Sequence, residues 1–173
     1  PWNFPLHLLT RSICPALAAG NTVVCKASSM TPVTAQILGE IFIQAGVPAG
    51  VYNAVSGSGS IVGEALLASD DVDVATLTGS EEVGRRLMEA SSKAKRIKKL
   101  VLELGGKSAS IVEPDCNLEG AVNGVTLGFC MNQGEVCCSA SRLVLSDEIY
   151  EEFIDALIEK ISSIKIGNAL DED

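Results

Sequence analysis

Short runs of apolar residues alternate along the chain with longer segments in which apolar positions recur every three or four residues. The runs have the length of buried strands, and the periodic segments have the length of helices. The expected strands are residues 21–25, 51–55, 74–77, 100–104, 110–112 and 142–145. The expected helices are residues 33–45, 61–68, 81–90, 118–130 and 148–164. Strands that alternate with crossover helices indicate an α/β fold with a mostly parallel sheet.

Local signals mark several of the expected boundaries. Thr31 and Pro32 suit the N-cap and the first position of a helix that Gly46 ends. The adjacent Gly105 and Gly106 interrupt two strand candidates. This pair is the best candidate for a hinge between two domains.

The composition narrows the class of protein. Of the 173 residues, 47% are hydrophobic, 20% are charged and only 4% are aromatic, which indicates a globular core of aliphatic side chains. The net charge of −9 and the lack of a basic face argue against a nucleic-acid partner. No apolar run approaches the roughly 18 residues that a membrane span needs. The one basic cluster is interpreted as a solvated helix end and consists of Lys93, Lys95, Arg96, Lys98 and Lys99.

The six cysteines are irregularly spaced and accompany a single histidine. This pattern favours neither a disulfide framework nor a metal site, so reduced thiols in a cytoplasmic protein are expected. The chain does not begin with Met and its two ends look truncated. A targeting sequence ahead of residue 1 therefore stays open.

Two segments carry candidate chemistry, NQGEVCC (132–138) and LELGGKS (102–108). The first offers two adjacent thiols, Cys137 and Cys138, in a glycine-containing turn where a backbone N–H could face an oxyanion. The second offers Glu103, a carboxylate that could activate water. A nucleophile and a separate base are the minimum equipment for covalent acyl chemistry. His7 is an alternative partner for a thiol, but its apolar neighbours indicate a packed or surface histidine.

Three glycine-containing segments are candidate phosphate sites. The GKS segment at 106–108 resembles the end of a P-loop, but a valine occupies the position of the essential first glycine, which excludes that motif. Gly57, Gly59 and Gly63 miss the dinucleotide fingerprint by one residue. The turn at Gly79 and Ser80 is a better phosphate candidate, because the N–H groups of a helix N-terminus attract anions. Ser80 could instead be a simple N-cap, and the two roles can coexist.

Five motifs in register resemble the aldehyde dehydrogenase superfamily over essentially the whole chain. They are PWNFP (1–5), NTVVCKASSMTP (21–32), LTGSEEVG (77–84), LELGGKS (102–108) and NQGEVCC (132–138). The resemblance implies that residues 1–104 are part of a Rossmann-like NAD(P)-binding domain and that residues 105–173 begin a second α/β catalytic domain. The chain would then be a central fragment, expected to be inactive and unstable alone, of an enzyme that forms a dimer or tetramer.

The resemblance also implies a role for each site residue. Cys137 would be the nucleophile, and Glu103 would be the base that activates water. Asn3 would form the oxyanion hole together with the backbone N–H at Cys137. The positions implied to bind NAD or NADP are Trp2, Lys26, Ser29, Gly57, Gly79, Ser80 and Gly84. The implied reaction is oxidation of an aldehyde to a carboxylic acid through a thiohemiacetal and a thioester, and no metal is implied.

Three positions depart from the superfamily pattern. Ser29 occupies a position where many NAD-preferring members carry Glu, and the loss of that charge beside Lys26 predicts that NADP is also accepted. Glu135 stands where Gln is common, and its carboxylate is expected to point away from the thiol. Leu77 replaces a common Phe, which indicates a packing change only.

Other functions remain as alternatives. A CoA-acylating dehydrogenase would pass the acyl group to CoA, and a base for water at Glu103 argues against it. A non-catalytic protein could retain the fold, but Asn3, Glu103 and Cys137 are all intact. A thiol hydrolase of unrelated fold is the most distant alternative.

Overall fold

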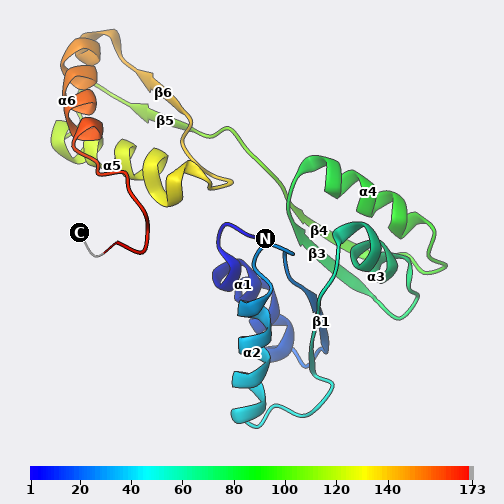
Figure 1. The fold of residues 1–173 in the computed structure, drawn as a ribbon. Helices are drawn as coiled ribbons and strands as arrows, with labels where there is room; N and C mark the ends of the chain where they lie inside the picture. Colours follow the sequence, from blue (N-terminus) through cyan, green and yellow to red (C-terminus); the bar gives the residue numbers. More distant parts are fainter. Residues whose placement is uncertain (172–173) are drawn as a thin grey trace. The chain divides into compact units, whose positions relative to one another are not determined.

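The computed structural model describes residues 1–171, which divide between Gly105 and Gly106 into two compact units (Figure 1). The division falls at the glycine pair that the sequence indicates as a hinge candidate. Unit 1 comprises residues 1–105, and unit 2 begins at Gly106. Every strand pair among the described residues is parallel, which confirms the predicted α/β class.

Unit 1 contains two pairs of parallel strands with a crossover helix in each. Its elements are α1 (Pro5–Ala18), β1 (Val23–Lys26), α2 (Val33–Gln44), β2 (Tyr52–Val55), a π-helical turn η1 (Gly59–Gly63), α3 (Glu64–Ala68), β3 (Val74–Thr78), α4 (Glu81–Ser92) and β4 (Lys99–Glu103). Strand β1 pairs with β2 so that Lys26 lies opposite Val55. Strand β3 pairs with β4 so that Thr78 lies opposite Glu103. The carboxyl ends of paired strands therefore coincide.

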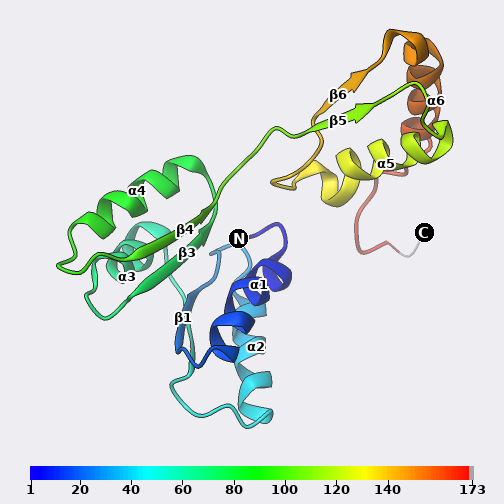
Figure 2. The ribbon, with the colours of Figure 1, turned by 180° about the vertical axis from the view of Figure 1, so that it is seen from behind.

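Two apolar clusters hold unit 1 together. Helices α1 and α2 lie side by side next to β1 in both views, and Ile13, Cys25 and Ala35 are buried between them (Figures 1 and 2). The hydroxyl of Tyr52 donates a hydrogen bond of 2.8 Å to the carbonyl of Ala35. Burial raises the pKa of Tyr52 and of the Cys25 thiol. The second cluster joins α3 and α4 to the other strand pair through Leu67, Leu87 and Ala90.

Unit 2 is a single parallel strand pair packed against two helices. Its elements are β5 (Ala109–Val112), α5 (Leu118–Cys130), a 3₁₀ turn η2 (Met131–Gly134), β6 (Arg142–Leu145), a 3₁₀ turn η3 (Asp147–Ile149) and α6 (Tyr150–Ser162). Phe153 of α6 is completely buried against Val112, Val122 and Val125. No helix of the described residues is long and apolar enough to cross a membrane.

Helix α1 was not predicted from the sequence, and the predicted N-cap of α2 is wrong. Helix α1 begins at Pro5 and contains Pro15 in its interior, and a proline inside a segment is normally a sign that a helix ends there. Helix α2 begins at Val33, and no side chain caps it. The predicted capping role of Thr31 is therefore wrong: the Thr31 hydroxyl is buried without a hydrogen-bond partner in the described structure.

The prediction that the basic cluster is solvated is wrong for Lys98 and holds for its other four members, which are exposed. Its side chain is only 7% exposed, and its ammonium group donates to the carbonyls of Ser69 and Val72, at 2.6 Å in the second case. These two carbonyls belong to the loop between α3 and β3. Lys98 therefore ties the start of β4 to that loop, with the charge satisfied by backbone oxygens. Lys99, the next residue, is exposed as predicted.

Replacing Lys98 by methionine is expected to lower the free energy of unfolding of the full-length protein by about 2 kcal/mol, because two partly buried carbonyls lose a charged donor. Lys99→Met is the matched control, since it makes the same change one residue later on the surface. Chemical denaturation of the two variants measures the difference. Equal stabilities would show that the Lys98 hydrogen bonds contribute nothing.

Candidate active site

The candidate residues of unit 1 gather at the carboxyl ends of its parallel strands. Lys26 is the last residue of β1 and Glu103 is the last residue of β4. The other positions follow strands at short distances: Ser29 follows β1, Gly57 follows β2, and Gly79 and Ser80 follow β3 directly. In open α/β sheets the carboxyl ends of the strands form the ligand-binding edge. Within each strand pair, the topology thus brings together at one end candidate residues that lie far apart in the sequence.

Hydrogen bonds fix the turn between β3 and α4. The Gly79 N–H donates to the carbonyl of Glu103 at 3.0 Å, which extends the strand pairing by one residue. The Ser80 hydroxyl accepts a hydrogen bond of 3.3 Å from the Val83 N–H. The prediction that Ser80 is an N-cap is therefore confirmed. A phosphate contact at this turn stays a prediction.

Local packing leaves little or no room for a side chain at two of the candidate glycines. A Cβ atom at Gly84, which is buried in α4, would lie 3.0 Å from Cδ2 of Leu104. Gly57 has a φ of +145°, and a Cβ atom there would lie 2.5 Å from Cγ2 of Val62. Glycine at position 84 lets α4 approach β4, and glycine at position 57 lets the loop after β2 close on itself. Contact of either residue with a cofactor stays a prediction.

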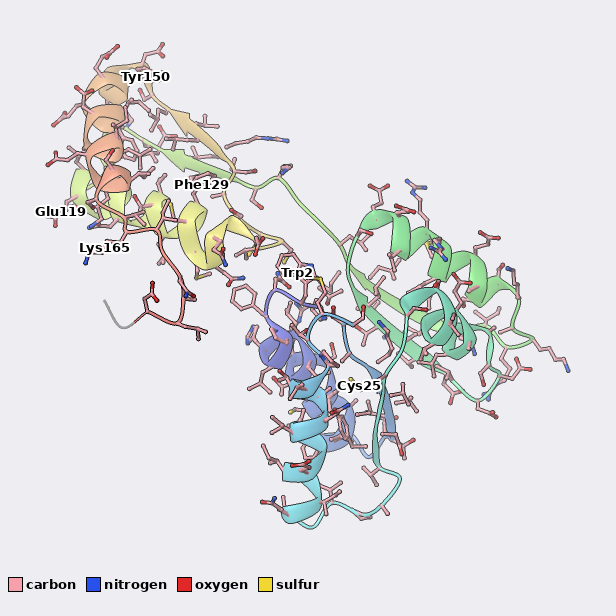
Figure 3. The ribbon with its side chains drawn as sticks, viewed as in Figure 1. Trp2, Cys25, Glu119, Phe129, Tyr150 and Lys165 are labelled. Atoms are coloured by element: carbon pink, nitrogen blue, oxygen red, sulfur yellow. The ribbon has the colours of Figure 1, made fainter. Side chains whose placement is uncertain are left out.

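The PWNFP motif leads into α1. Trp2 is 44% exposed and Asn3 is half-buried, directly before the helix begins at Pro5 (Figure 3). His7 is exposed on α1 and meets the ring of Phe4 edge-on, with centroids 6.4 Å apart. His7 is therefore a surface histidine, as the sequence predicts.

Glu103 has an ionic partner that the sequence did not reveal. The Arg11 guanidinium on α1 lies 2.5 Å from Oε1 of Glu103, and the two side chains are 45% and 41% exposed. Arg11 lies outside the five motifs, and it is 92 positions away from Glu103 in the sequence (103 − 11). No local pattern could have indicated this pair. The carboxylate is accessible to water and ionically paired at the same time.

In unit 2, the candidate nucleophile follows a strained stretch of backbone. Asn132, Gln133 and Gly134 have φ angles of 48°, 61° and 77°, three left-handed residues in succession. For a residue other than glycine this conformation costs about 1–2 kcal/mol. Strain of this kind persists only where the surrounding structure enforces it, and it clusters at functional sites. The strained stretch ends two residues before the segment Val136–Cys137.

The turn that carries the two thiols is closed by a hydrogen bond of 3.0 Å from the Ser139 N–H to the carbonyl of Val136. Within this turn Cys137 is half-buried and Cys138 is exposed. After the turn, a hydrogen bond of 3.1 Å from the Ala140 N–H to the carbonyl of Gly128 joins the chain to α5. A partly exposed thiol in a fixed turn is suited to nucleophilic attack.

Gly106 packs closely against the turn that carries Cys137. A Cβ atom at this position would lie 2.8 Å from the carbonyl oxygen of Cys137, closer than real side chains approach a backbone atom. Only glycine permits this contact without displacing Cys137. The sequence predicts a hinge at Gly106 and gives no indication of its packing against the candidate nucleophile.

The residues present fit a nicotinamide dinucleotide in their chemistry. Lys26 supplies a cation and Ser29 a hydroxyl, and the β3–α4 turn supplies the backbone of a helix N-terminus. A cavity of about 160 Å³ in unit 1 is lined by residues of α1, β1, α2 and β3. It is too small for a whole dinucleotide, since ligand sites usually measure about 300–1,000 Å³. Within the described residues no group of three or more His, Cys, Asp or Glu side chains could hold a metal ion.

The parallel strand pairs with crossover helices place this chain in the class of α/β proteins. The chain belongs to the aldehyde dehydrogenase family, whose model matches residues 1–173. This match confirms the resemblance that the five motifs indicate.

Similar proteins cover the whole chain. Mitochondrial succinate-semialdehyde dehydrogenase of Oryza sativa is 44% identical over 172 residues, 99% of this chain and 32% of that protein. The NADP(+) succinate-semialdehyde dehydrogenase GabD of Escherichia coli is 46% identical over 99% of this chain and 35% of that protein. The crystal structure of PnpE from Pseudomonas sp. WBC-3 with nicotinamide adenine dinucleotide is 43% identical, with a TM-score of 0.94 over 99% of this chain and 35% of that chain. The chain thus spans about a third of the length of these relatives.

Proposed function

We propose that the full-length protein oxidises an aldehyde to a carboxylic acid with NAD or NADP. The observation that carries this proposal is the strained turn that presents a half-buried Cys137, in a chain of the aldehyde dehydrogenase family. Relatives use one or the other cofactor: GabD is named for NADP, and PnpE was crystallised with nicotinamide adenine dinucleotide.

The first step joins Cys137 to the substrate. The thiolate adds to the carbonyl carbon of the aldehyde, and the carbonyl oxygen becomes an oxyanion. The Asn3 amide and the backbone N–H at Cys137 are proposed to donate to that oxyanion, and the loss of one such donor typically costs about 3 kcal/mol. A nicotinamide, when bound, would accept the hydride that the thiohemiacetal carbon loses. A thioester on Cys137 remains.

The second step returns the free enzyme. The Glu103 carboxylate takes a proton from water, and the resulting hydroxide attacks the thioester carbon. The carbon–sulfur bond breaks, the acid leaves with the Cys137 thiolate restored, and Glu103 releases its proton to solvent. Glu103 and Cys137 act in succession on the same acyl group, so the proposal does not require a hydrogen bond between them.

The architecture proposed for the full-length protein follows the family. Residues 1–104 would form part of the NAD(P)-binding domain, and residues 105–173 would begin the catalytic domain. Trp2, Gly57, Gly84 and the Gly79–Ser80 turn would line the cofactor site. The protein would act in the cytoplasm as a homodimer or homotetramer.

The test is reduction of the cofactor at 340 nm by purified full-length protein with a panel of aldehydes. The panel includes succinate semialdehyde, which two relatives carry in their names. The acid product is identified by mass spectrometry with and without CoA. An acyl-CoA product would favour the CoA-acylating alternative, and no cofactor reduction with any aldehyde would favour a non-catalytic protein.

Cofactor choice provides a more specific prediction. The full-length protein is expected to accept NADP as well as NAD, because Lys26 can attract a 2′-phosphate and Ser29 does not repel it. Ser29→Glu is expected to lower kcat/KM for NADP about tenfold or more and to leave NAD within about threefold, by like-charge repulsion. Steady-state kinetics with both cofactors measure the ratio. A wild-type protein that uses NAD alone would contradict the prediction.

A further inference from the structure

The ion pair between Arg11 and Glu103 connects two elements that the proposed mechanism uses. Arg11 lies on α1, which begins two residues after Asn3, and Glu103 ends β4. The distance between the guanidinium nitrogen and Oε1 is 2.5 Å. The backbone of Glu103 is fixed independently, because its carbonyl accepts from the Gly79 N–H. The ion pair therefore fixes only the side chain, whose rotamer decides where the carboxylate points.

A free glutamate on a surface samples several rotamers, and a general base must hold one that faces its water. The guanidinium fork can restrict the carboxylate to one side of β4. A carboxylate has about four lone-pair sites, so an ion pair through Oε1 leaves capacity to accept from water. Both side chains remain more than 40% exposed, so water can reach the pair.

The pair is expected to contribute little to the stability of the fold. Exposed ion pairs contribute only about 0–1 kcal/mol to stability. The same unit contains a second pair of the same length, between Arg86 and Glu64 at 2.5 Å, with exposed fractions of 49% and 39%. That pair joins α4 to α3 and includes no candidate catalytic group. It provides a control for the loss of an exposed ion pair in itself.

We propose that Arg11 is a positioning residue that holds the Glu103 carboxylate for the activation of water. The proposal rests on the function proposed above and assigns Arg11 to one step only, hydrolysis of the thioester. Arg11 contributes nothing to the formation of the thioester. Loss of the guanidinium therefore slows hydrolysis selectively.

The test uses full-length protein and p-nitrophenyl acetate, which needs neither an aldehyde nor a cofactor. The Cys137 thiolate attacks the ester carbon, p-nitrophenolate leaves, and an acetyl thioester forms. Water then attacks the thioester as Glu103 takes its proton, and acetate leaves with the thiolate restored. The absorbance of p-nitrophenolate reports acylation. Mass spectrometry of acid-quenched samples, taken after removal of the reagent, reports the decay of the acetyl-enzyme.

Arg11→Gln is expected to slow decay of the acetyl-enzyme about five- to tenfold while acylation stays within about twofold, the size of effect that a modest misplacement of the base produces. Arg11→Lys, which retains the charge without the planar fork, should lie between this variant and the wild type. Arg86→Gln should change neither step. Thermal melting verifies that all variants are folded.

Three outcomes would overturn the proposal for Arg11: decay at the wild-type rate in Arg11→Gln, equal slowing of both steps, or the same slowing in Arg86→Gln. The double variant Arg11→Gln/Glu103→Gln should decay as slowly as Glu103→Gln alone, because Arg11 acts through Glu103. Wild-type decay in Glu103→Gln would instead refute the proposed base. Slow decay in Glu103→Gln beside normal decay in Arg11→Gln would refute only the role of Arg11.

Discussion

Alanine at Cys137 is expected to abolish aldehyde oxidation by the full-length protein, with kcat/KM lowered at least about 10³-fold, because the covalent intermediate cannot form. Reduction of NAD or NADP at 340 nm measures the loss. Acetylation by p-nitrophenyl acetate should disappear in the same variant. Cofactor affinity should remain, since Cys137 is assigned no role in holding the dinucleotide.

Cys138→Ala is the matched control, because it removes the same thiol one residue further along the same turn. Cys138 is exposed whereas Cys137 is half-buried beside Gly106. The control should keep activity within about threefold of the wild type, as expected for a surface substitution without a catalytic role. Activity that survives in Cys137→Ala and is lost in Cys138→Ala would transfer the nucleophile to Cys138.

Glutamine at Glu103 is expected to slow hydrolysis of the thioester by about 10²–10⁴-fold, the usual contribution of a general base. The amide has the shape of the carboxylate but cannot take a proton from water. Formation of the thioester should continue, so acid-quenched protein should carry the mass of the acyl group. Mass spectrometry of samples taken during turnover detects it on the peptide that contains Cys137.

Glu135→Gln is the control for this change, since it makes the same exchange two residues from Cys137. It should leave hydrolysis within about threefold, as expected for a carboxylate that does not act on the thioester. If Glu135→Gln accumulates the acyl-enzyme and Glu103→Gln does not, the base has been assigned to the wrong residue.

The strands were predictable because each is a short apolar run between turn signals. The expected strand at 142–145 has the same limits as β6, and the others differ from the structure by one or two residues. Helix α1 was not predictable from these rules, since Pro15 usually ends a helix. Lys98 is buried because its ammonium group donates to two carbonyls near residue 70. The basic residues around it in the sequence instead indicate an exposed segment.

In the candidate site, too, features set by neighbouring residues were predictable and contacts between distant residues were not. Cys137, Glu103 and the Gly79–Ser80 turn belong to recognisable motifs, and Ser80 caps its helix as the local pattern predicts. Arg11 and the contact of Gly106 with Cys137 depend on residues brought together only by the fold. Pairings of this kind leave no periodic signal, because neither partner constrains the residues beside it.

The three parallel strand pairs also bear on synthesis of the protein at the ribosome. The pairs occupy residues 23–55, 74–103 and 109–145, so they follow one another without overlap. Each pair can close as soon as its second strand emerges, because it needs no segment that is made later. Closure of such short loops costs little entropy compared with pairing of the chain ends. The strand pair that ends in Glu103 can therefore form before the Cys137 turn has been translated.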